Sequence, residues 1–215
     1  AHAQGDYLLA DRVHRILDHM GMRGYMYEHY PHPGRRAADA VLSALRDSAE
    51  VAVFLTDVGA GSAWVHQELG AAIALDKPVI PILDGESPQA PGFADLERSV
   101  VYDARRPEVA IGHLLWNLRV DFDIFEGPLD VECPECHAYS RIDLPTMHAV
   151  REAMDRDRLI PGSTCGECTR RLYVSPYTME PVSEQLALGR HHELGCPGAR
   201  LVIIAEQVQQ AVSLL

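Results

Sequence analysis

Two hydrophobic patterns alternate along the first 120 residues of the chain. Apolar residues recur about every 3.6 positions in 6–20 and again in 37–48, and this period predicts helices with one buried face. Short unbroken apolar runs at 51–55 and 79–83 instead predict strands that are covered on both faces. Because such strands alternate with helices, the pattern favours an α/β fold with a parallel sheet.

The central stretch of this half, residues 62–83, joins a helix directly to a buried strand. The predicted apolar face of the helix consists of Trp64, Leu69, Ala72 and Ile73. Pro78 ends the helix, because the residue before a proline is disfavoured in the helical region. Glu68 lies four residues after Trp64, and therefore one turn further along the same side of the helix.

Less regular segments complete the first half. We predict a short strand at Gly24–Tyr27, an edge strand at 99–102 and a final helix at 109–118. Glu28–Arg36 contains two prolines and a glycine and is therefore predicted to be a loop. A second loop is expected at 58–61, where a ligand crevice can form beyond the carboxyl ends of the strands.

The Trp-x-x-x-Glu motif at 64–68, followed by small residues and the strand sequence PVIPI, closely resembles the TIR (Toll/interleukin-1 receptor) domain. The match is to the NAD-cleaving members of that family and covers about the first half of the chain, residues 1–120. An isolated glutamate on an amphipathic helix is usually only solvated. Here the resemblance implies that Glu68 is the catalytic residue, that NAD is the substrate and that the sheet is flavodoxin-like with flanking helices.

Further site residues follow from the same resemblance. Trp64 would stack on the nicotinamide or adenine ring. The other contacts to ribose or phosphate would come from His2, Tyr30 and Arg35. In this family the loop corresponding to Glu28–Arg36 covers the nucleotide site and contacts the next protomer, which implies a homo-oligomer. The alternative for this loop is a plain solvated turn.

The start of the chain departs from the family pattern. Ala1-His2-Ala3 falls where the family has a Ser-His at the end of its first, central strand. We therefore expect that strand to be absent or reduced to a stub. Missing pairing would cost its neighbours about 1–3 kcal/mol for each unpaired group. The tail at Leu201–Leu215 is an alternative occupant if it forms a strand, and otherwise reads as a helix that packs on a partner.

A second module follows a predicted linker at 121–130. Its two C-x-x-C motifs supply Cys133, Cys136, Cys165 and Cys168. Four cysteines in two such pairs predict a tetrahedral zinc site, and hence a zinc ribbon at 131–180 with a helix inserted at 148–158. Because so small a module buries little core, metal binding would supply much of its folding free energy.

Two other interpretations of the cysteines are weaker. The sequence CPECH at 133–137 matches a haem attachment motif, but no export signal is visible and the second cysteine pair would stay unexplained. Disulfides are disfavoured in a reducing compartment. Cys196, in the C-terminal extension 181–215, is predicted to be a free thiol.

Charge narrows the possible partners. The chain has 19 basic and 31 acidic residues, a net charge of −12, which argues against a broad surface for nucleic acid or anionic membrane. No apolar stretch approaches the roughly 20 residues that span a bilayer, and no signal peptide is visible, so we expect a cytoplasmic protein. Arginines of the ribbon are mixed with acidic residues, which favours a structural or protein-contact role for that module.

These observations combine into one hypothesis with two rivals. The first is an enzyme that cleaves NAD to nicotinamide and a linear, cyclic or conjugated ADP-ribose, similar to the small TIR proteins of bacterial anti-phage systems such as Thoeris. The main rival is a non-enzymatic TIR interaction module with the ribbon as adaptor. A more distant rival is a nucleotide sensor without turnover. Release of nicotinamide from NAD distinguishes the first from the others.

Overall fold

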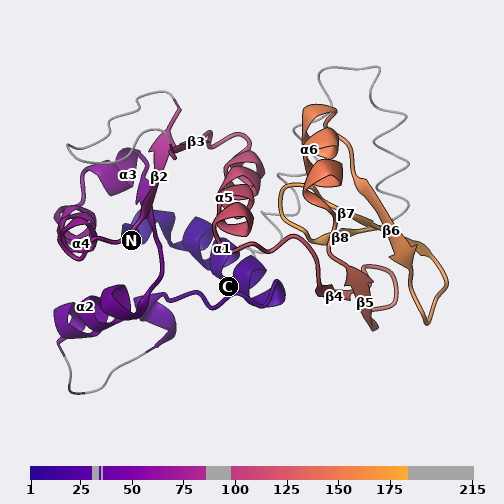
Figure 1. Ribbon diagram of the computed structural model, residues 1–215, viewed down its shortest axis with the longest axis horizontal. Coiled ribbons are helices and arrows are strands. Elements are labelled where there is room, and N and C mark those ends of the chain that lie inside the picture. Colours follow the sequence, from indigo (N-terminus) through magenta and orange to yellow (C-terminus); the bar gives the residue numbers. More distant parts are fainter. Residues whose placement is uncertain (31–33, 35, 86–97, 184–215) are drawn as a thin grey trace.

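The computed structural model describes residues 1–30, 34, 36–85 and 98–183. The helices, of which η1 and η2 are 3-10 turns, are η1 (Gln4–Asp6), α1 (Tyr7–His19), η2 (Tyr27–His29), α2 (Ala37–Asp47), α3 (Asp57–Ala60), α4 (Ala63–Ala74), α5 (Pro107–Asp121) and α6 (Met147–Asp155). The strands are β1 (Val51–Leu55), β2 (Val79–Asp84), β3 (Val100–Tyr102), β4 (Pro128–Glu132), β5 (Tyr139–Asp143), β6 (Ile160–Thr164), β7 (Arg171–Val174) and β8 (Pro181–Val182). Figure 1 shows these elements as two packed halves.

The first half is a parallel sheet in the order β1-β2-β3, with helices on both faces (Figure 1). Successive side chains of a strand point to opposite faces, and β1 follows this rule: Val53 joins one buried cluster and Phe54 the other. The first cluster lies under α2 and α4, and the second lies under α1 and α5. This arrangement confirms the predicted flavodoxin-like α/β fold.

The first-strand position holds only a stub among the described residues. Ala1 lies beside β1, where its nitrogen donates to the Ala52 carbonyl at 2.9 Å and its carbonyl accepts from the Phe54 amide at 2.9 Å. The predicted strand at Gly24–Tyr27 is wrong: this segment is not a strand and leads into η2. This segment belongs to none of the sheets formed by the described residues, and a strand requires a partner along its length.

Two other local predictions need correction. The loop predicted at 58–61 is largely the short helix α3, because the hydroxyl of Thr56 accepts the Gly59 amide and caps its start. The apolar face of α4 is also rotated from the predicted one. Its buried residues are Val65, Leu69 and Ala72, whereas two members of the predicted face, Trp64 and Ile73, are exposed.

In the described part of the second half, up to residue 183, the chain forms β-hairpins and the helix α6. β4 pairs with β5, and β7 pairs with both β6 and β8, all antiparallel. α6 lies between the two sheets in the chain, close to the predicted helix at 148–158. β4 begins inside the predicted linker. The predictions for Cys196 and for nearly all of the extension 181–215 lie outside the described residues.

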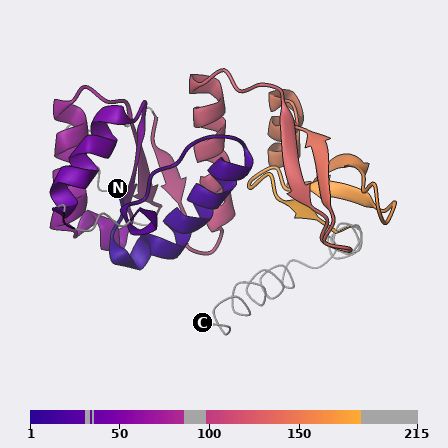
Figure 2. The same cartoon turned by 90° about the horizontal axis from the view of Figure 1, so that it is seen from below.

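The ribbon half packs against α5, on the side away from α2 and α4 (Figures 1 and 2). Arg119 near the end of α5 anchors this junction and is only 1% exposed. Its guanidinium donates to the carbonyls of Ile124 at 2.9 Å and Pro145 at 2.8 Å, and burial lowers its pKa. A buried arginine bonded to carbonyls rather than to a carboxylate ties three segments together without a paired charge.

Candidate functional site

Trp64 and Glu68 form the centre of the candidate site on α4. The helix begins at Ser62, whose hydroxyl accepts the Val65 amide. Burial of the adjoining face against β1 and β2 leaves Trp64 on the outer side, 41% exposed. The indole Nε1 donates to Glu68 Oε1 at 2.7 Å. The predicted pair is therefore joined by a direct hydrogen bond, which aims one carboxylate oxygen along the indole edge.

The environment of Glu68 changes its acidity. Burial raises the pKa of its carboxyl above the ordinary value, and the negative charge of Glu28 acts in the same direction. The indole N–H of Trp64 opposes this rise because it hydrogen-bonds to the ionised form. A half-buried carboxylate held in this way is an electrostatic group that water screens only in part.

His2 lies at the end of the stub, facing η2. Its Nε2 is 3.4 Å from Glu28 Oε1, and burial lowers the pKa of its imidazole. Glu28 was predicted only as the first residue of a loop, yet its charge acts on both His2 and Glu68. The structure therefore brings His2 and Glu28 together, and Glu28 close enough to Glu68 for its charge to act on that carboxyl. Nothing in the sequence indicated that Glu28 belongs to the site, because its position depends on where η2 lies in the fold.

Tyr30 stacks on Tyr25, with ring centroids 5.4 Å apart and planes inclined by 7°. Both rings are partly exposed, and Tyr25 was not among the predicted site residues. The turn η2 between them is tied to α1, because His29 Nε2 lies 2.9 Å from Asp11 Oδ1. Arg35, the remaining predicted contact, lies outside the described residues.

A buried polar pair joins the start of α1 to the start of α3. The Thr56 hydroxyl lies 2.7 and 2.8 Å from the two carboxylate oxygens of Asp6, and burial raises the pKa of that carboxyl. The pair joins the segment after the stub to the turn after β1. Gly59 completes the turn, since a Cβ there would stand 2.0 Å from the Phe54 carbonyl oxygen. Nothing in the sequence indicated this role of Asp6, which stands at the start of the predicted helix 6–20.

The arrangement around Glu68 suits one kind of ligand. Trp64, Tyr25 and Tyr30 offer flat aromatic surfaces, and two carboxylates, Glu68 and Glu28, supply negative charge. Aromatic faces and carboxylates both attract planar cations. Side chains of these kinds are able to stabilise a flat, positively charged group.

The four cysteines of the ribbon form a second candidate site. Their sulfur atoms all lie within 4.8 Å of one another. The Cys133 and Cys168 sulfurs are 3.8 Å apart, and those of Cys136 and Cys165 are 3.6 Å apart. Zinc held tetrahedrally at about 2.3 Å from each sulfur separates the sulfurs by about 3.8 Å, whereas a disulfide bond is about 2.05 Å long. The spacing fits a four-thiolate metal centre.

Both cysteine pairs sit on turns of the same shape. The Cys133 amide donates to the Ala138 carbonyl, and the His137 amide returns to the Cys133 carbonyl, both at 2.9 Å. The second turn repeats these two bonds through Cys165 and its neighbours. Backbone hydrogen bonds from Cys168 and Glu167 lower the pKa of Cys165 to about 6. At Cys136 a backbone hydrogen bond from Ala138 acts in the same direction, but burial and the neighbouring sulfurs outweigh it and raise the pKa to about 12. Binding of a metal would therefore release protons from this cluster.

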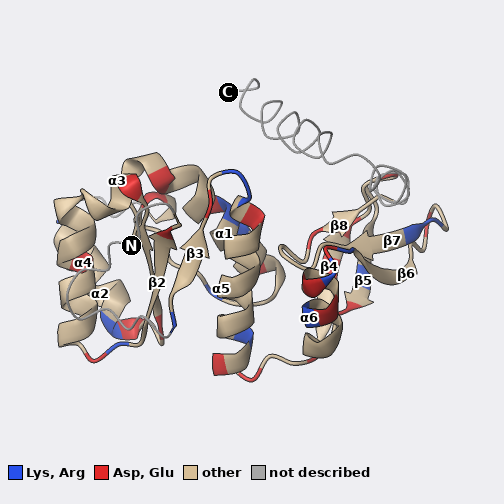
Figure 3. Ribbon diagram, turned by 90° about the horizontal axis from the view of Figure 1, so that it is seen from above, with Lys and Arg blue, Asp and Glu red and all other residues tan. Residues whose placement is uncertain are grey.

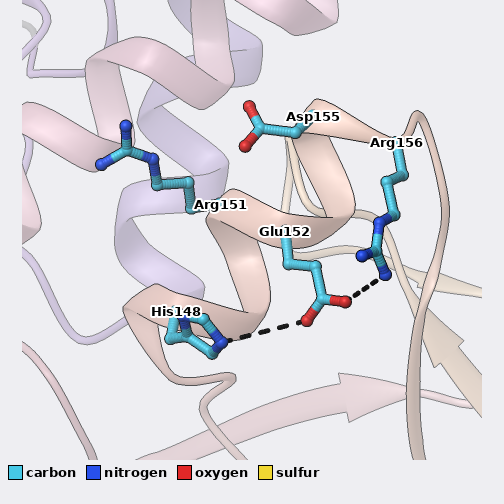
Figure 4. Close-up of a pocket in the computed structure, with 5 residues that line it drawn as sticks. All are labelled: His148, Arg151, Glu152, Asp155 and Arg156. Atoms are coloured by element: carbon cyan, nitrogen blue, oxygen red, sulfur yellow. Dashed lines mark hydrogen bonds and ion pairs between the residues drawn. The ribbon is translucent and has the colours of Figure 1, made fainter.

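A hollow on the surface of α6 is lined entirely by polar side chains. Its residues are His148, Arg151, Glu152, Asp155 and Arg156 (Figure 4). Glu152 pairs with Arg156 and lies 4.0 Å from His148, so its charge is met within the same helix (Figure 4). The hollow lacks the aromatic surfaces found beside Glu68. We regard it as a solvated helix face rather than a ligand site.

Comparison with known proteins covers the first half of the chain. A family model described as TIR domain matches residues 1–115, slightly more than half of the 215 residues. No curated protein matches the chain. In the part that the structure describes, no helix combines the length and apolar character needed to cross a membrane.

Proposed function

This chain belongs to the TIR-domain family, and from that premise we propose that it is an enzyme that cleaves NAD between nicotinamide and ribose. The observation that supports the proposal is the hydrogen bond between Trp64 and Glu68, which presents a half-buried carboxylate beside an exposed indole. An interaction surface needs neither the hydrogen bond nor the burial. A reaction that passes through a cationic sugar needs a fixed negative charge of this kind.

Glu68 would act on the charge that develops as the glycosidic bond breaks. The electron pair of the C1′–N bond leaves with nicotinamide, which departs as a neutral base, and the ribose becomes oxocarbenium-like. A carboxylate beside C1′ stabilises that positive charge more than it stabilises the substrate, which lowers the barrier. Water, or a nucleophile within the same molecule, then takes the ribosyl cation, and a linear, cyclic or conjugated ADP-ribose results.

Neighbouring side chains would position the dinucleotide. The exposed face of Trp64 would stack on the nicotinamide or adenine ring, and Tyr30 would add a second aromatic surface. Among the described residues, the buried His2 Nε2 has no hydrogen-bond partner, which leaves it suited to a ribose hydroxyl. Arg35 would meet a phosphate. In line with the family, the loop at 28–36 would also contact a neighbouring protomer in a homo-oligomer.

The ribbon would hold a structural zinc ion through Cys133, Cys136, Cys165 and Cys168. When bound, the metal supplies four strong bonds that link the two cysteine turns and stabilise the module. Acidic and basic side chains are interspersed over both halves of the molecule (Figure 3). That distribution supports a protein partner for the ribbon rather than a nucleic acid, which selects continuous positive surfaces.

The test of the enzymatic proposal is Glu68→Gln, which keeps the size of the side chain and removes its charge. Because the charge acts mainly near the transition state, turnover should fall on the order of 100- to 1,000-fold with little change in stability. Nicotinamide release from NAD measures the rate, and thermal melting measures the fold. Glu126→Gln, at an exposed linker position, is the matched control. A folded Glu68→Gln protein with the wild-type rate would contradict the proposal.

An interaction module is the second candidate, because Tyr25, Tyr30 and Trp64 are all exposed and aromatic residues are enriched at protein interfaces. In that case the ribbon would act as an adaptor, and the wild-type protein would release no nicotinamide. For the enzyme, the biological setting we propose is bacterial anti-phage signalling in the cytoplasm, where the cleaved nucleotide is the signal.

A further inference from the structure

The ribbon contains a third turn with the shape of its two cysteine turns. In Ser175–Glu180 the Ser175 amide donates to the Glu180 carbonyl at 2.9 Å, and the Met179 amide returns to the Ser175 carbonyl at 3.0 Å. Met179 has φ 57°, as His137 and Thr169 have 59° and 61° at the equivalent positions of the cysteine turns. The sequence is Ser-x-x-Thr where the others have Cys-x-x-Cys.

In this third turn, hydrogen bonds to a side-chain hydroxyl take the place of metal–sulfur bonds. The Ser175 hydroxyl accepts the amides of Tyr177 and Thr178, both at 3.3 Å. These are the positions from which backbone hydrogen bonds reach the sulfur in the second cysteine turn. The third turn thus keeps its shape through a serine and lies outside the metal centre. Its side chains do not serve as metal ligands and contact the TIR domain instead.

Tyr177, at the tip of the third turn, packs directly on α5. A Cβ at Gly112 would stand 2.9 Å from Tyr177 Cδ1 and 3.0 Å from its Cα, so only glycine allows this approach. The Tyr177 hydroxyl lies 3.2 Å from Asp157 Oδ1, and Arg106 Nη2 reaches the same oxygen at 3.2 Å. Tyr177 therefore contacts α5 closely at Gly112, and its hydroxyl takes part in a polar network with Asp157 and Arg106 that links the two halves of the molecule.

Glu180, the last residue of the third turn, contacts a different helix of the TIR domain. Its carboxylate accepts from Arg12 Nη2 at 2.9 Å, and Arg12 lies in α1. One turn of six residues thus touches both helices, α1 and α5, that cover the same face of the parallel sheet. That pair of contacts makes the turn a bridge between the ribbon and one whole face of the TIR domain.

The buried core runs without a break from the metal centre to the sheet. Cys133 and Cys165 belong to the same cluster of buried residues as Ile111 and Leu115 of α5 and Ile82 of β2. Cores of this density transmit changes in packing because they contain few voids that could absorb them. A change in packing at the cysteines is therefore expected to alter the packing of α5.

We propose that the Ser175–Glu180 turn is a docking site for α5 and α1, and that metal binding at the four cysteines stabilises the TIR domain through it. The ribbon on this view is part of the folding unit of the TIR domain and not an independent appendage. Loss of the metal would loosen the two cysteine turns first. It would then release the third turn from Gly112 and uncover the apolar surface of α5.

Hydrogen exchange of the full chain, followed by mass spectrometry, tests the proposal on unmodified protein. Metal-loaded protein is compared with protein treated with a zinc chelator. Exchange in 107–121 and 7–19 should rise by at least about tenfold after chelation, which corresponds to about 1.4 kcal/mol of local stability. If chelation raises exchange only in 128–182, the proposal is overturned. The readout does not use NAD, so it is independent of the enzymatic proposal.

A pair of glycine variants tests the docking contact itself. Gly112→Ala should loosen α5 and the third turn while the zinc content stays at the wild-type level, although alanine favours helix more than glycine. Gly70→Ala in α4 is the control, because a Cβ there meets nothing within 4 Å. Wild-type exchange in Gly112→Ala would overturn the docking site. Tyr177→Ala, which removes the ring and adds no atoms, should loosen the same two segments. The chelation experiment is independent of both variants, because it uses the wild-type protein.

Discussion

At the scale of single residues, Glu68 gains its character from one neighbour and from its depth. The spacing of four residues predicted that Trp64 and Glu68 share a helix face, and the structure joins them at 2.7 Å. Spacing did not predict the burial that raises the pKa of the carboxyl or the approach of Glu28. Glu28 lies in η2, far from Glu68 in the sequence, so only the fold lets its charge act on that carboxyl.

The raised pKa predicts a particular pH dependence. If the ionised carboxylate of Glu68 is the active form, kcat/KM should rise with pH through the folded-state pKa, with a midpoint above the ordinary value of 4.5. Trp64→Phe keeps a flat ring but removes the N–H that favours the ionised form, so the midpoint should move to higher pH. Rates of nicotinamide release between about pH 4 and 8 would show this.

The matched control for the pH experiment is Trp116→Phe, a tryptophan of α5 outside the candidate site. Its profile should coincide with that of the wild-type protein. A wild-type midpoint at or below 4.5, or the same midpoint in Trp64→Phe, would show that this carboxyl does not control the rate.

At the scale of elements, the turn after β1 depends on a contact that local sequence does not reveal. Thr56 both caps α3 and donates to the buried carboxylate of Asp6. Its position before a short run with Gly59 and Gly61 resembles an ordinary loop, which is why a loop was predicted there. The helix forms because the cap and the Asp6 contact satisfy the polar groups of the turn.

Thr56→Val tests this element, since it keeps the shape of the side chain and removes the hydroxyl. The change leaves the buried Asp6 carboxylate without its donor and removes the helix cap, so the free energy of unfolding should fall by about 1–3 kcal/mol. Denaturant unfolding would measure it. Thr164→Val, at an exposed position of β6, should be nearly neutral. Equal stability of the two variants would show that the contact is unimportant.

At the scale of the whole molecule, the two halves share one core and are not simply joined by a linker. Arg119 holds the end of α5 to the carbonyls of Ile124 and Pro145, and the third turn of the ribbon holds its middle. One long helix is thus fixed at two points. The predicted linker at 121–130 is in part the start of β4 and in part the segment that Arg119 binds.

Arg119→Met should weaken this junction. Methionine fills part of the buried volume but donates no hydrogen bond, and each buried carbonyl left unpaired costs about 1–3 kcal/mol. The melting temperature should drop by several degrees, because about 1 kcal/mol corresponds to roughly 2–4 °C in a protein of this size. Arg23→Met, on the exposed surface, serves as the comparison. A variant at Arg119 that melts with the wild-type protein would contradict the role of this anchor.

The sequence by itself determined the features that depend on neighbours in the chain. The hydrophobic period placed α1 and α2, and unbroken apolar runs placed β1 and β2, since each of these elements buries positions that its own residues define. The helix α4 was placed as well, although its buried face is rotated from the predicted one. The Trp64–Glu68 pair and the two cysteine motifs were also visible, because ligand and helix spacing are local properties. The spacing of the two C-x-x-C motifs was enough to predict the four cysteines as metal ligands.

Tertiary structure alone decided the contacts between distant segments. Nothing in local spacing shows that Asp6 meets Thr56, that Glu28 acts on Glu68 or that Gly112 receives Tyr177. The same holds for the Gly24–Tyr27 segment, which has the residues of a strand but is not one. A strand requires a partner along its length, and this segment belongs to none of the sheets formed by the described residues.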